Sequence, residues 1–185
     1  MKISTDFTIP LPPEDAYRFL LDLEQVAPCV PGGELGPARA DGSHPAKVTV
    51  KLGPMRLVYD GSLWISEQDD ASRRAVLRAK ARETGAQGSL EASMTMQVTS
   101  NGGGSRVDVL TELALAGRAA RMGRGLVDEV ARRLVSDMAS CLEQRLAGQG
   151  GGGEAPAAAA QISGIKLLLH AVVERFGRIA RKGER

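Results

Sequence analysis

Apolar and polar residues alternate with period two in six stretches of this chain. In the first, Ile3, Phe7 and Ile9 point one way while Lys2, Ser4, Asp6 and Thr8 point the other. The remaining five stretches have their apolar or small residues at alternate positions within 48–52, 57–65, 75–81, 90–98 and 107–115. This alternation is typical of an antiparallel sheet with one face in water and one face buried. The buried face needs a cover.

The same pattern, together with turn residues, predicts the order of the elements. We expect strands at about 2–9, 34–40, 46–52, 56–66, 73–81, 88–99 and 105–116. Asp41-Gly42 and Asn101-Gly102 predict tight hairpins. Pro12-Pro13 begins one helix after the first strand, because proline is tolerated in a first helical turn. A second short helix at about 23–27 ends at Pro28.

A long helix at about 119–147 is the expected cover of the sheet. Apolar side chains recur there at steps of three and four residues, at Met122, Leu126, Val130, Leu134, Met138, Cys141 and Leu142. Gly148 is a suitable C-cap. We therefore divide the chain into a domain at 1–147, a Gly/Ala-rich linker at 148–161 and a tail at 162–185.

Strand, two helices, six strands and a long helix form a helix-grip arrangement, an α+β fold in which seven antiparallel strands curl around the last helix. Several segments carry a more specific resemblance: Phe19-Leu20-Leu21-Asp22 through Val30-Pro31-Gly32, Leu52-Gly53-Pro54, Tyr59-Asp60-Gly61, Gly85 with Gly88, and Leu115-Ala116-Gly117 leading to Arg124. With these residues the chain resembles the CoxG family, the G subunits of carbon monoxide dehydrogenase, within the START-like (SRPBCC, Bet v 1-like) superfamily. The resemblance covers about residues 1–147.

Residues that could perform catalysis are scarce. The two histidines, His44 and His170, lie in a turn and in the tail, and no Cys/His cluster has metal-ligand spacing. Glu91 and Glu112 occupy strand positions that face away from the buried side. We therefore expect neither an enzyme nor a metal or covalent cofactor. Arg118, Arg121 and Arg124 could hold an anion at the mouth of the fold or form a solvated face.

The two cysteines, Cys29 and Cys141, are far apart in sequence. Free thiols in a reducing compartment are the expected state for such a pair. The first residues include Asp6 and lack the apolar segment of a signal peptide. A cytoplasmic location is the default expectation.

The space between sheet and helix is the first candidate site. Inward positions of the sheet are often small or flexible, and methionine adapts to irregular apolar partners. The residues alone leave two alternatives, a filled core and a cavity. Protein interiors normally pack without voids, which favours the filled core. The resemblance implies an apolar pocket for an elongated ligand, to which Tyr59 or Thr111 could give a hydrogen bond. We expect the lining to be Tyr59, Leu63, Ala79, Met94, Met96, Thr111, Met122, Leu126, Val130, Leu134 and Met138.

The tail is the second candidate site. Residues 161–185 have a net charge of +4 and the rest of the chain −2. Charged residues interrupt any run long enough to cross a bilayer, so an in-plane amphipathic helix on an anionic membrane is expected. Docking on a partner protein or on the domain itself are the alternatives. The membrane-binding residues would be Ile165, Lys166, Leu168, Leu169, Val172, Phe176, Arg178, Ile179, Arg181 and Lys182.

The acidic body and the low aromatic content argue against nucleic-acid binding. The resemblance implies a non-covalently bound quinone, such as menaquinone, or another lipid. It also implies a molybdenum-containing carbon monoxide dehydrogenase, or a related hydroxylase, as partner. We expect a peripheral protein on the inner face of the cell membrane, whose role is to shuttle the ligand between the membrane and the dehydrogenase. An adaptor that recruits the dehydrogenase without a core ligand, and a superfamily enzyme acting on a lipid-like substrate, are the alternatives.

Overall fold

Residues 1–149 are described by the structure, a computed structural model. All seven expected strands are present within this range. They are β1 (Lys2–Ile9), β2 (Gly33–Leu35), β3 (His44–Leu52), β4 (Met55–Asp69), β5 (Arg74–Glu83), β6 (Ser89–Asn101) and β7 (Gly104–Ala116). The helical elements are α1 (Pro13–Leu21), α2 (Leu23–Val26), the 3-10 helices η1 (Ala27–Cys29) and η2 (Ala119–Met122), and α3 (Arg124–Gln149).

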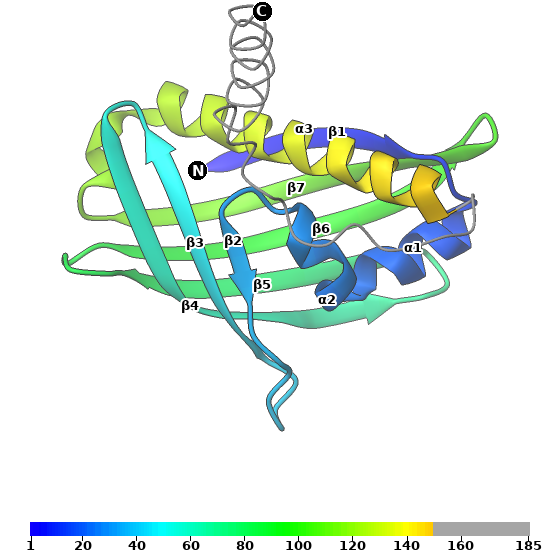
Figure 1. The fold of residues 1–185 in the computed structure, drawn as a ribbon, viewed down its shortest axis with the longest axis horizontal. Helices are drawn as coiled ribbons and strands as arrows, with labels where there is room; N and C mark the ends of the chain where they lie inside the picture. The colour runs from blue at the N-terminus through cyan, green and yellow to red at the C-terminus, as the bar shows by residue number, and fades with distance from the viewer. Residues whose placement is uncertain (150–185) are drawn as a thin grey trace, which may run out of the picture. The chain divides into compact units, whose positions relative to one another are not determined.

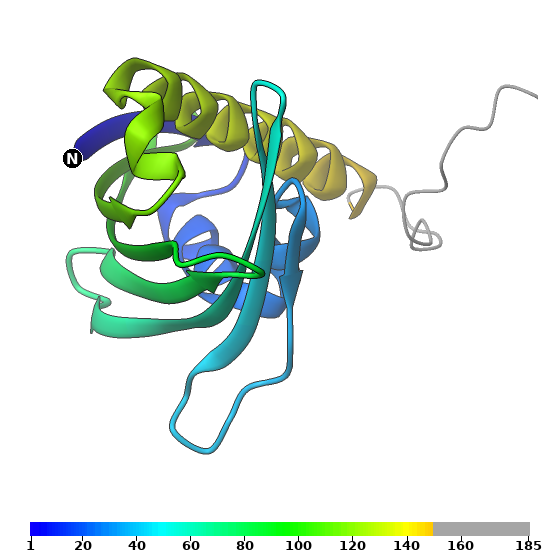
Figure 2. The same ribbon diagram turned by 90° about the vertical axis from the view of Figure 1, so that its left-hand side faces the viewer.

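The strands form one antiparallel sheet in the order β1-β7-β6-β5-β4-β3-β2. The first and last strands along the chain, β1 and β7, are neighbours, and their pairing sets Ile3 opposite Thr111. The sheet curls into a half-barrel, and α3 runs across its concave side along β1 (Figures 1 and 2). The helix-grip fold expected from the sequence is confirmed.

The first helices are positioned by local signals. Pro13 occupies the first turn of α1, with Glu14 and Asp15 beside it, where acidic side chains interact favourably with the helix dipole. Asp22 ends α1 and caps α2 by accepting a hydrogen bond from the backbone N–H of Gln25 at 3.1 Å. These two helices therefore turn sharply and lie at one end of the concave face (Figure 1).

Two expected elements differ in detail. The strand expected at 34–40 ends at Leu35, shortly before Pro37, which has no N–H for a strand ladder. The helix expected at 119–147 is interrupted at Gly123, whose φ of +81° separates η2 from α3. Downstream, α3 continues through Gly148 to Gln149, the last described residue, instead of stopping at the expected C-cap.

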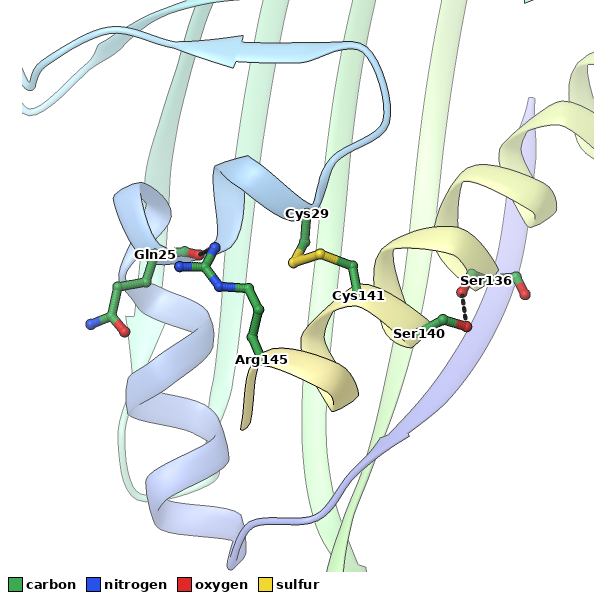
Figure 3. The surroundings of a disulfide bond; sticks show 6 residues. All are labelled: Gln25, Cys29, Ser136, Ser140, Cys141 and Arg145. Atoms are coloured by element: carbon green, nitrogen blue, oxygen red, sulfur yellow. Dashed lines mark hydrogen bonds between the residues drawn. A yellow bond between two sulfur atoms is a disulfide. The ribbon is translucent and has the colours of Figure 1, made fainter. Parts of the chain in front are cut away.

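A disulfide joins Cys29 of η1 to Cys141 of α3, with the two Cα atoms 5.4 Å apart (Figure 3). The expectation of two free thiols was therefore wrong. Spacing in the sequence could not reveal the pair, because the fold itself brings η1 against the last third of α3. Arg145 adds a second link to the same region by donating a hydrogen bond to the backbone oxygen of Gln25 at 3.0 Å.

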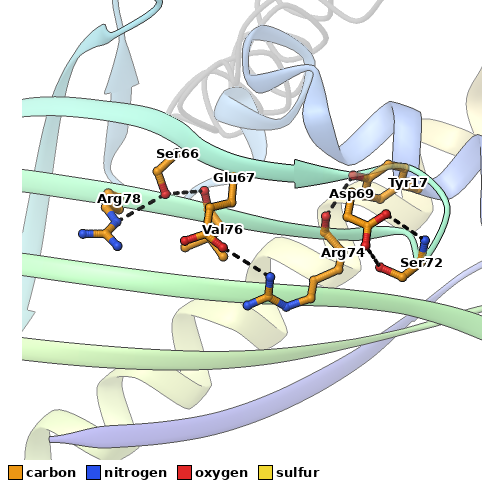
Figure 4. A network of polar contacts seen from close by, with 8 residues as sticks. All are labelled: Tyr17, Ser66, Glu67, Asp69, Ser72, Arg74, Val76 and Arg78. Carbon is orange, nitrogen blue, oxygen red and sulfur yellow. Dashed lines mark hydrogen bonds and ion pairs between the residues drawn. The ribbon is translucent and has the colours of Figure 1, made fainter.

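The sheet bends at a bulge in β4, where the register with β5 shifts between Ile65 and Glu67. The period-two pattern of the sequence did not predict this bulge. At the bulge, the Ser66 hydroxyl donates to the backbone oxygen of Val76 at 3.1 Å (Figure 4). Nearby, the hydroxyl of buried Tyr17 donates to the backbone oxygen of Arg74 at 3.0 Å and so ties α1 to β5.

The apolar core consists of two separate clusters. Cluster A lies at the α1 end and contains Phe7, Ile9, Ala16, Tyr17, Leu20, Cys29, Ala75, Met96, Val98, Val107, Ala139 and Leu142. Cluster B lies at the η2 end and is built on Leu52, Leu57, Tyr59 and Ala119. The disulfide joins α3 to cluster A, since Cys29 belongs to it and Cys141 packs against it.

Candidate functional site

A middle section separates the two clusters on the inner face of the sheet. Its residues pair across the strands: Leu63 with Ala79, Ala79 with Ala92, and Met94 with Thr111. The apolar ones belong to neither cluster, and all remain partly exposed although they share the inner face with the core. Fully packed interiors leave few voids, so this partial exposure distinguishes the middle section from both clusters. The middle section comprises Leu63, Ala79, Ala92, Met94, Thr111 and Leu113 on the sheet and Leu134 on α3.

The residues expected to line a cavity are distributed over all three regions. Met96 is 6% exposed and lies inside cluster A, and Met138 packs against the same cluster. Tyr59 is part of cluster B, with Met122, Leu126 and Val130 packed against it. The middle section contains the remaining expected lining residues, Leu63, Ala79, Met94, Thr111 and Leu134.

Two hollows on the described residues have no lining residue from α3. One, of about 400 Å³, is lined by charged residues of the outer sheet face such as Lys80 and Glu91, and also by Ala79, Ala92 and Leu113, whose side chains belong to the middle section. The other, of about 440 Å³, lies between the short helices and β2, near Pro28 and Leu35. Both are open to the surface and lined in part by polar groups.

A polar cluster adjoins cluster B on the inner face. Glu83 is the last residue of β5 and lies directly opposite Tyr59 of β4. Its side chain is fully buried and forms an ion pair with Arg118, whose Nε donates to Oε1 at 2.9 Å. Burial raises the pKa of Tyr59, and the negative charge of Glu83 raises it further while Arg118 opposes the shift. Tyr59 therefore keeps its proton well above neutral pH.

Glu83 was not among the predicted site residues, and Arg118 was expected at the surface. The available signal was the alternation itself, because Ala75, Leu77, Ala79 and Ala81 place position 83 on the same inner face. The predicted strand ended two residues too early, at Ala81, and so excluded it. Arg118 is 46% exposed, as expected for a surface residue, and its guanidinium also pairs with a buried carboxylate of its own chain, which the sequence did not predict.

Other polar residues lie on the outer face, as expected. Glu91 pairs with Lys80 at 3.5 Å and Glu112 pairs with Lys2 at 2.7 Å, all four side chains being exposed. Within residues 1–149, no three His, Cys, Asp or Glu side chains are grouped so that they could hold a metal ion.

The membrane-binding residues expected in the tail, from Ile165 to Lys182, lie outside the described residues, as do most of the expected linker and the whole tail. In the part of the chain that is described, no helix is both long and apolar enough to cross a bilayer.

Solved structures with the same fold come from several bacteria. A conserved protein from Geobacillus kaustophilus superposes with a TM-score of 0.70 at 15% identity, covering 80% of this chain and 97% of that one. The ZhuI aromatase/cyclase from Streptomyces sp. R1128 superposes with a TM-score of 0.55 at 13% identity, covering 82% of this chain and 99% of that one. A START superfamily protein from Mycobacterium smegmatis superposes with a TM-score of 0.51 at 12% identity, covering 80% of this chain and 98% of that one. At these identities the likeness concerns the fold alone.

Among curated proteins, none matches this chain. A family match does exist: the CoxG family, described as the G subunit of carbon monoxide dehydrogenase, matches residues 6–147. This range contains the whole sheet apart from the start of β1, all the short helices and nearly all of α3. The chain therefore belongs to the CoxG family of carbon monoxide dehydrogenase subunits.

Proposed function

We propose that this protein binds an apolar ligand between the sheet and α3 and carries it between the membrane and a molybdenum-containing carbon monoxide dehydrogenase. The family and the START-like fold support an accessory, ligand-binding role. A quinone such as menaquinone is the ligand that we propose, because a dehydrogenase in water that passes its electrons to quinone needs a protein to bring it a carrier that water does not dissolve. The redox chemistry belongs to the dehydrogenase or to a related hydroxylase.

The division of the core carries this proposal. Clusters A and B pack around the two ends of the fold, while Leu63, Ala79 and Met94 between them are apolar, inward-facing and partly exposed. Ligand sites are typically concave, mostly apolar and equipped with a few polar groups. An elongated apolar molecule lying along the middle section would bury these side chains and contribute about 25 cal/mol per Å² of apolar surface removed from water.

We assign the membrane contact to residues 162–185. Their apolar and basic residues alternate at helical spacing, which suits an in-plane helix whose basic face meets anionic head groups. Each Lys or Arg near such a surface contributes about 1 kcal/mol. We place the protein on the inner face of the cell membrane. The sequence argument for this location used free thiols, and it no longer applies because Cys29 and Cys141 form a disulfide. We base the location on membership of the CoxG family instead.

Two other functions would use the same fold. An adaptor would hold the dehydrogenase at the membrane without a ligand in its core. A superfamily enzyme would convert a lipid-like substrate, and the ZhuI neighbour is named as an aromatase/cyclase. No observation in residues 1–149 favours either of them over carriage of a ligand.

Native mass spectrometry and solvent extraction of the purified full-length protein separate the three functions. Carriage predicts a stoichiometric prenylated quinone, recovered without chemical change. An adaptor predicts no ligand after purification from any membrane-containing extract. An enzyme predicts turnover of a lipid-like compound that is lost when one polar inner-face residue is replaced.

The membrane assignment has its own experiment, because residues 1–149 contain every described element and lie within one compact unit. A chain ending at Gly151 is expected to fold and to stop floating with anionic vesicles, while the full chain floats with them. Neutral vesicles are the control for charge. If the shortened chain is fully retained on anionic vesicles, the tail is not the membrane-binding segment.

A further inference from the structure

Two buried oxygen atoms on the inner face have no hydrogen-bond partner within residues 1–149: the hydroxyl of Tyr59 and Oε2 of Glu83. They belong to residues that face each other across β4 and β5. Tyr59 is 2% exposed, and the side chain of Glu83 is completely buried. A buried polar group without a partner destabilises the folded state, and more so when it is charged. We therefore expect these two oxygen atoms to form hydrogen bonds with a group that is not part of residues 1–149.

The surrounding backbone holds the Glu83 carboxylate in this position. The N–H of Glu83 donates to the backbone oxygen of Gly88 at 2.8 Å. Gly88 itself is buried, and a Cβ there would clash with Oε2 and lie 2.9 Å from the Cβ of Glu83. Gly117, at φ +80°, lies so close to Gly88 that a Cβ would be 2.7 Å from its Cα. This close approach places Arg118, the next residue, beside Glu83.

Arg118 satisfies only one side of the carboxylate. Both of its hydrogen bonds, from Nε and from Nη2, go to Oε1. Oε2, the second acceptor of this ion-paired carboxylate, has no donor within residues 1–149. An ionised carboxylate oxygen can only accept hydrogen bonds, whereas a phenol hydroxyl can donate or accept. A group that satisfies Oε2 therefore has to offer a donor, whereas one that satisfies the Tyr59 hydroxyl can donate or accept.

Small residues connect this polar cluster to the middle section. Gly61 pairs with Ala46 on one side and Ala81 on the other, one step along the inner face from Tyr59 and Glu83. The next step in the same rows is Leu63 and Ala79 of the middle section. Side-chain volume is thus low along the line from the polar cluster to the apolar region. A ligand with a polar end at Glu83 would extend its apolar part toward Ala79.

We propose that Glu83 and Tyr59 form the polar end of the ligand site and bind a neutral hydroxyl donor on an aromatic or aliphatic ligand. For a quinone carrier, this selects the reduced form, whose ring hydroxyls donate, over the oxidised form, whose carbonyls only accept. Anionic head groups are disfavoured beside Glu83. This inference rests on the function proposed above, since it names the head group of that ligand.

Two stable compounds test the donor requirement by calorimetry on the full-length protein. 1-Naphthol has an apolar ring and a hydroxyl donor, and 1-methoxynaphthalene has the same ring and an oxygen that cannot donate. A charge-assisted hydrogen bond is expected to make 1-naphthol bind about tenfold more tightly. E83Q, which removes the charge but keeps the shape, is expected to reduce this preference to about twofold or less. Tyr59→Phe is expected to reduce it while leaving the fold intact.

Glu91→Gln is the matched control, because Glu91 is an exposed carboxylate on the outer face. It is expected to leave both affinities unchanged. Equal binding of the two compounds by the wild-type protein would overturn the head-group assignment and would mean that only water occupies the polar end. Binding of neither compound would instead overturn the proposed ligand-binding function, and the head-group assignment with it. The two failures are thus distinguishable.

Discussion

Cys29 and Cys141 are 112 residues apart in sequence, and their disulfide joins the short η1 helix to the helix that covers the sheet. Cys29 is 3% exposed and belongs to cluster A. The bond therefore fixes one end of α3 against the packed end of the fold. At the other end, α3 begins after Gly123, where the backbone has a positive φ.

Removing the disulfide is expected to lower the free energy of unfolding. The C29S/C141S double variant should lose about 2–4 kcal/mol, because a cross-link that closes a long loop restricts the unfolded chain. Chemical denaturation followed by circular dichroism measures the change. Ser140→Ala, next to Cys141 on an exposed position, is the control and should change stability by less than about 0.5 kcal/mol. Equal stability of the double variant and the wild type would show that the cross-link does not stabilise the fold.

Gly61 is expected to tolerate no side chain. A Cβ there would overlap the backbone oxygen of Lys80 and lie 2.5 Å from the Cα of Ala81. These are backbone atoms of the neighbouring strand, which cannot move without disturbing the β4–β5 ladder. Gly61→Ala should therefore reduce the free energy of unfolding by about 1–3 kcal/mol, as measured by thermal or chemical denaturation.

Gly125 provides the matched control for that substitution. It lies in the first turn of α3 with open space around it. Gly125→Ala should be neutral or stabilising by up to about 1 kcal/mol, because alanine favours a helix more than glycine does. A Gly61→Ala variant as stable as Gly125→Ala would contradict the close approach of β4 and β5.

The sheet and its covering helix could be predicted from the sequence because one-sided burial imposes a period of two on the six longer strands. The inner positions of β5 and β6, such as Ala79 and Met94, follow directly from that period. The disulfide and the Glu83–Arg118 ion pair could not be predicted in this way, because each joins segments that only the complete fold brings together. The boundary between the packed clusters and the middle section could not be predicted from the sequence either. Met96 and Met94 are both methionines that face the same side of β6, yet they differ in burial.

Filling the middle section is expected to affect ligand binding more than stability. Met94→Trp adds a large side chain where the inner face is partly exposed, so the free energy of unfolding should change by less than about 3 kcal/mol. Retention of a prenylated naphthoquinone, measured by extraction after reconstitution, should fall strongly. Met138→Trp should also reduce ligand retention, and it should lower the free energy of unfolding more than Met94→Trp does, because Met138 packs against cluster A.

Thr95→Trp is the control for these variants, since the alternation of β6 places its side chain on the opposite face from Met94. It should leave ligand retention unchanged. Retention that is equally high in Met94→Trp and Thr95→Trp would place the ligand outside the middle section and would contradict the proposed site.

The two tyrosines give the fold a defined response to alkaline pH. Burial raises the pKa of both Tyr17 and Tyr59, and nearby carboxylates, Asp70 and Glu83, raise each further. In the unfolded chain both phenols titrate near pH 10. The folded chain therefore binds more protons than the unfolded chain above that pH, so stability is fully present below about pH 10 and is lost as pH rises. Because these are the only tyrosines, tyrosinate absorbance should appear late and together with the loss of circular dichroism. Tyrosinate that forms near pH 10 in a chain that is still folded would mean that at least one of these hydroxyls is accessible to water.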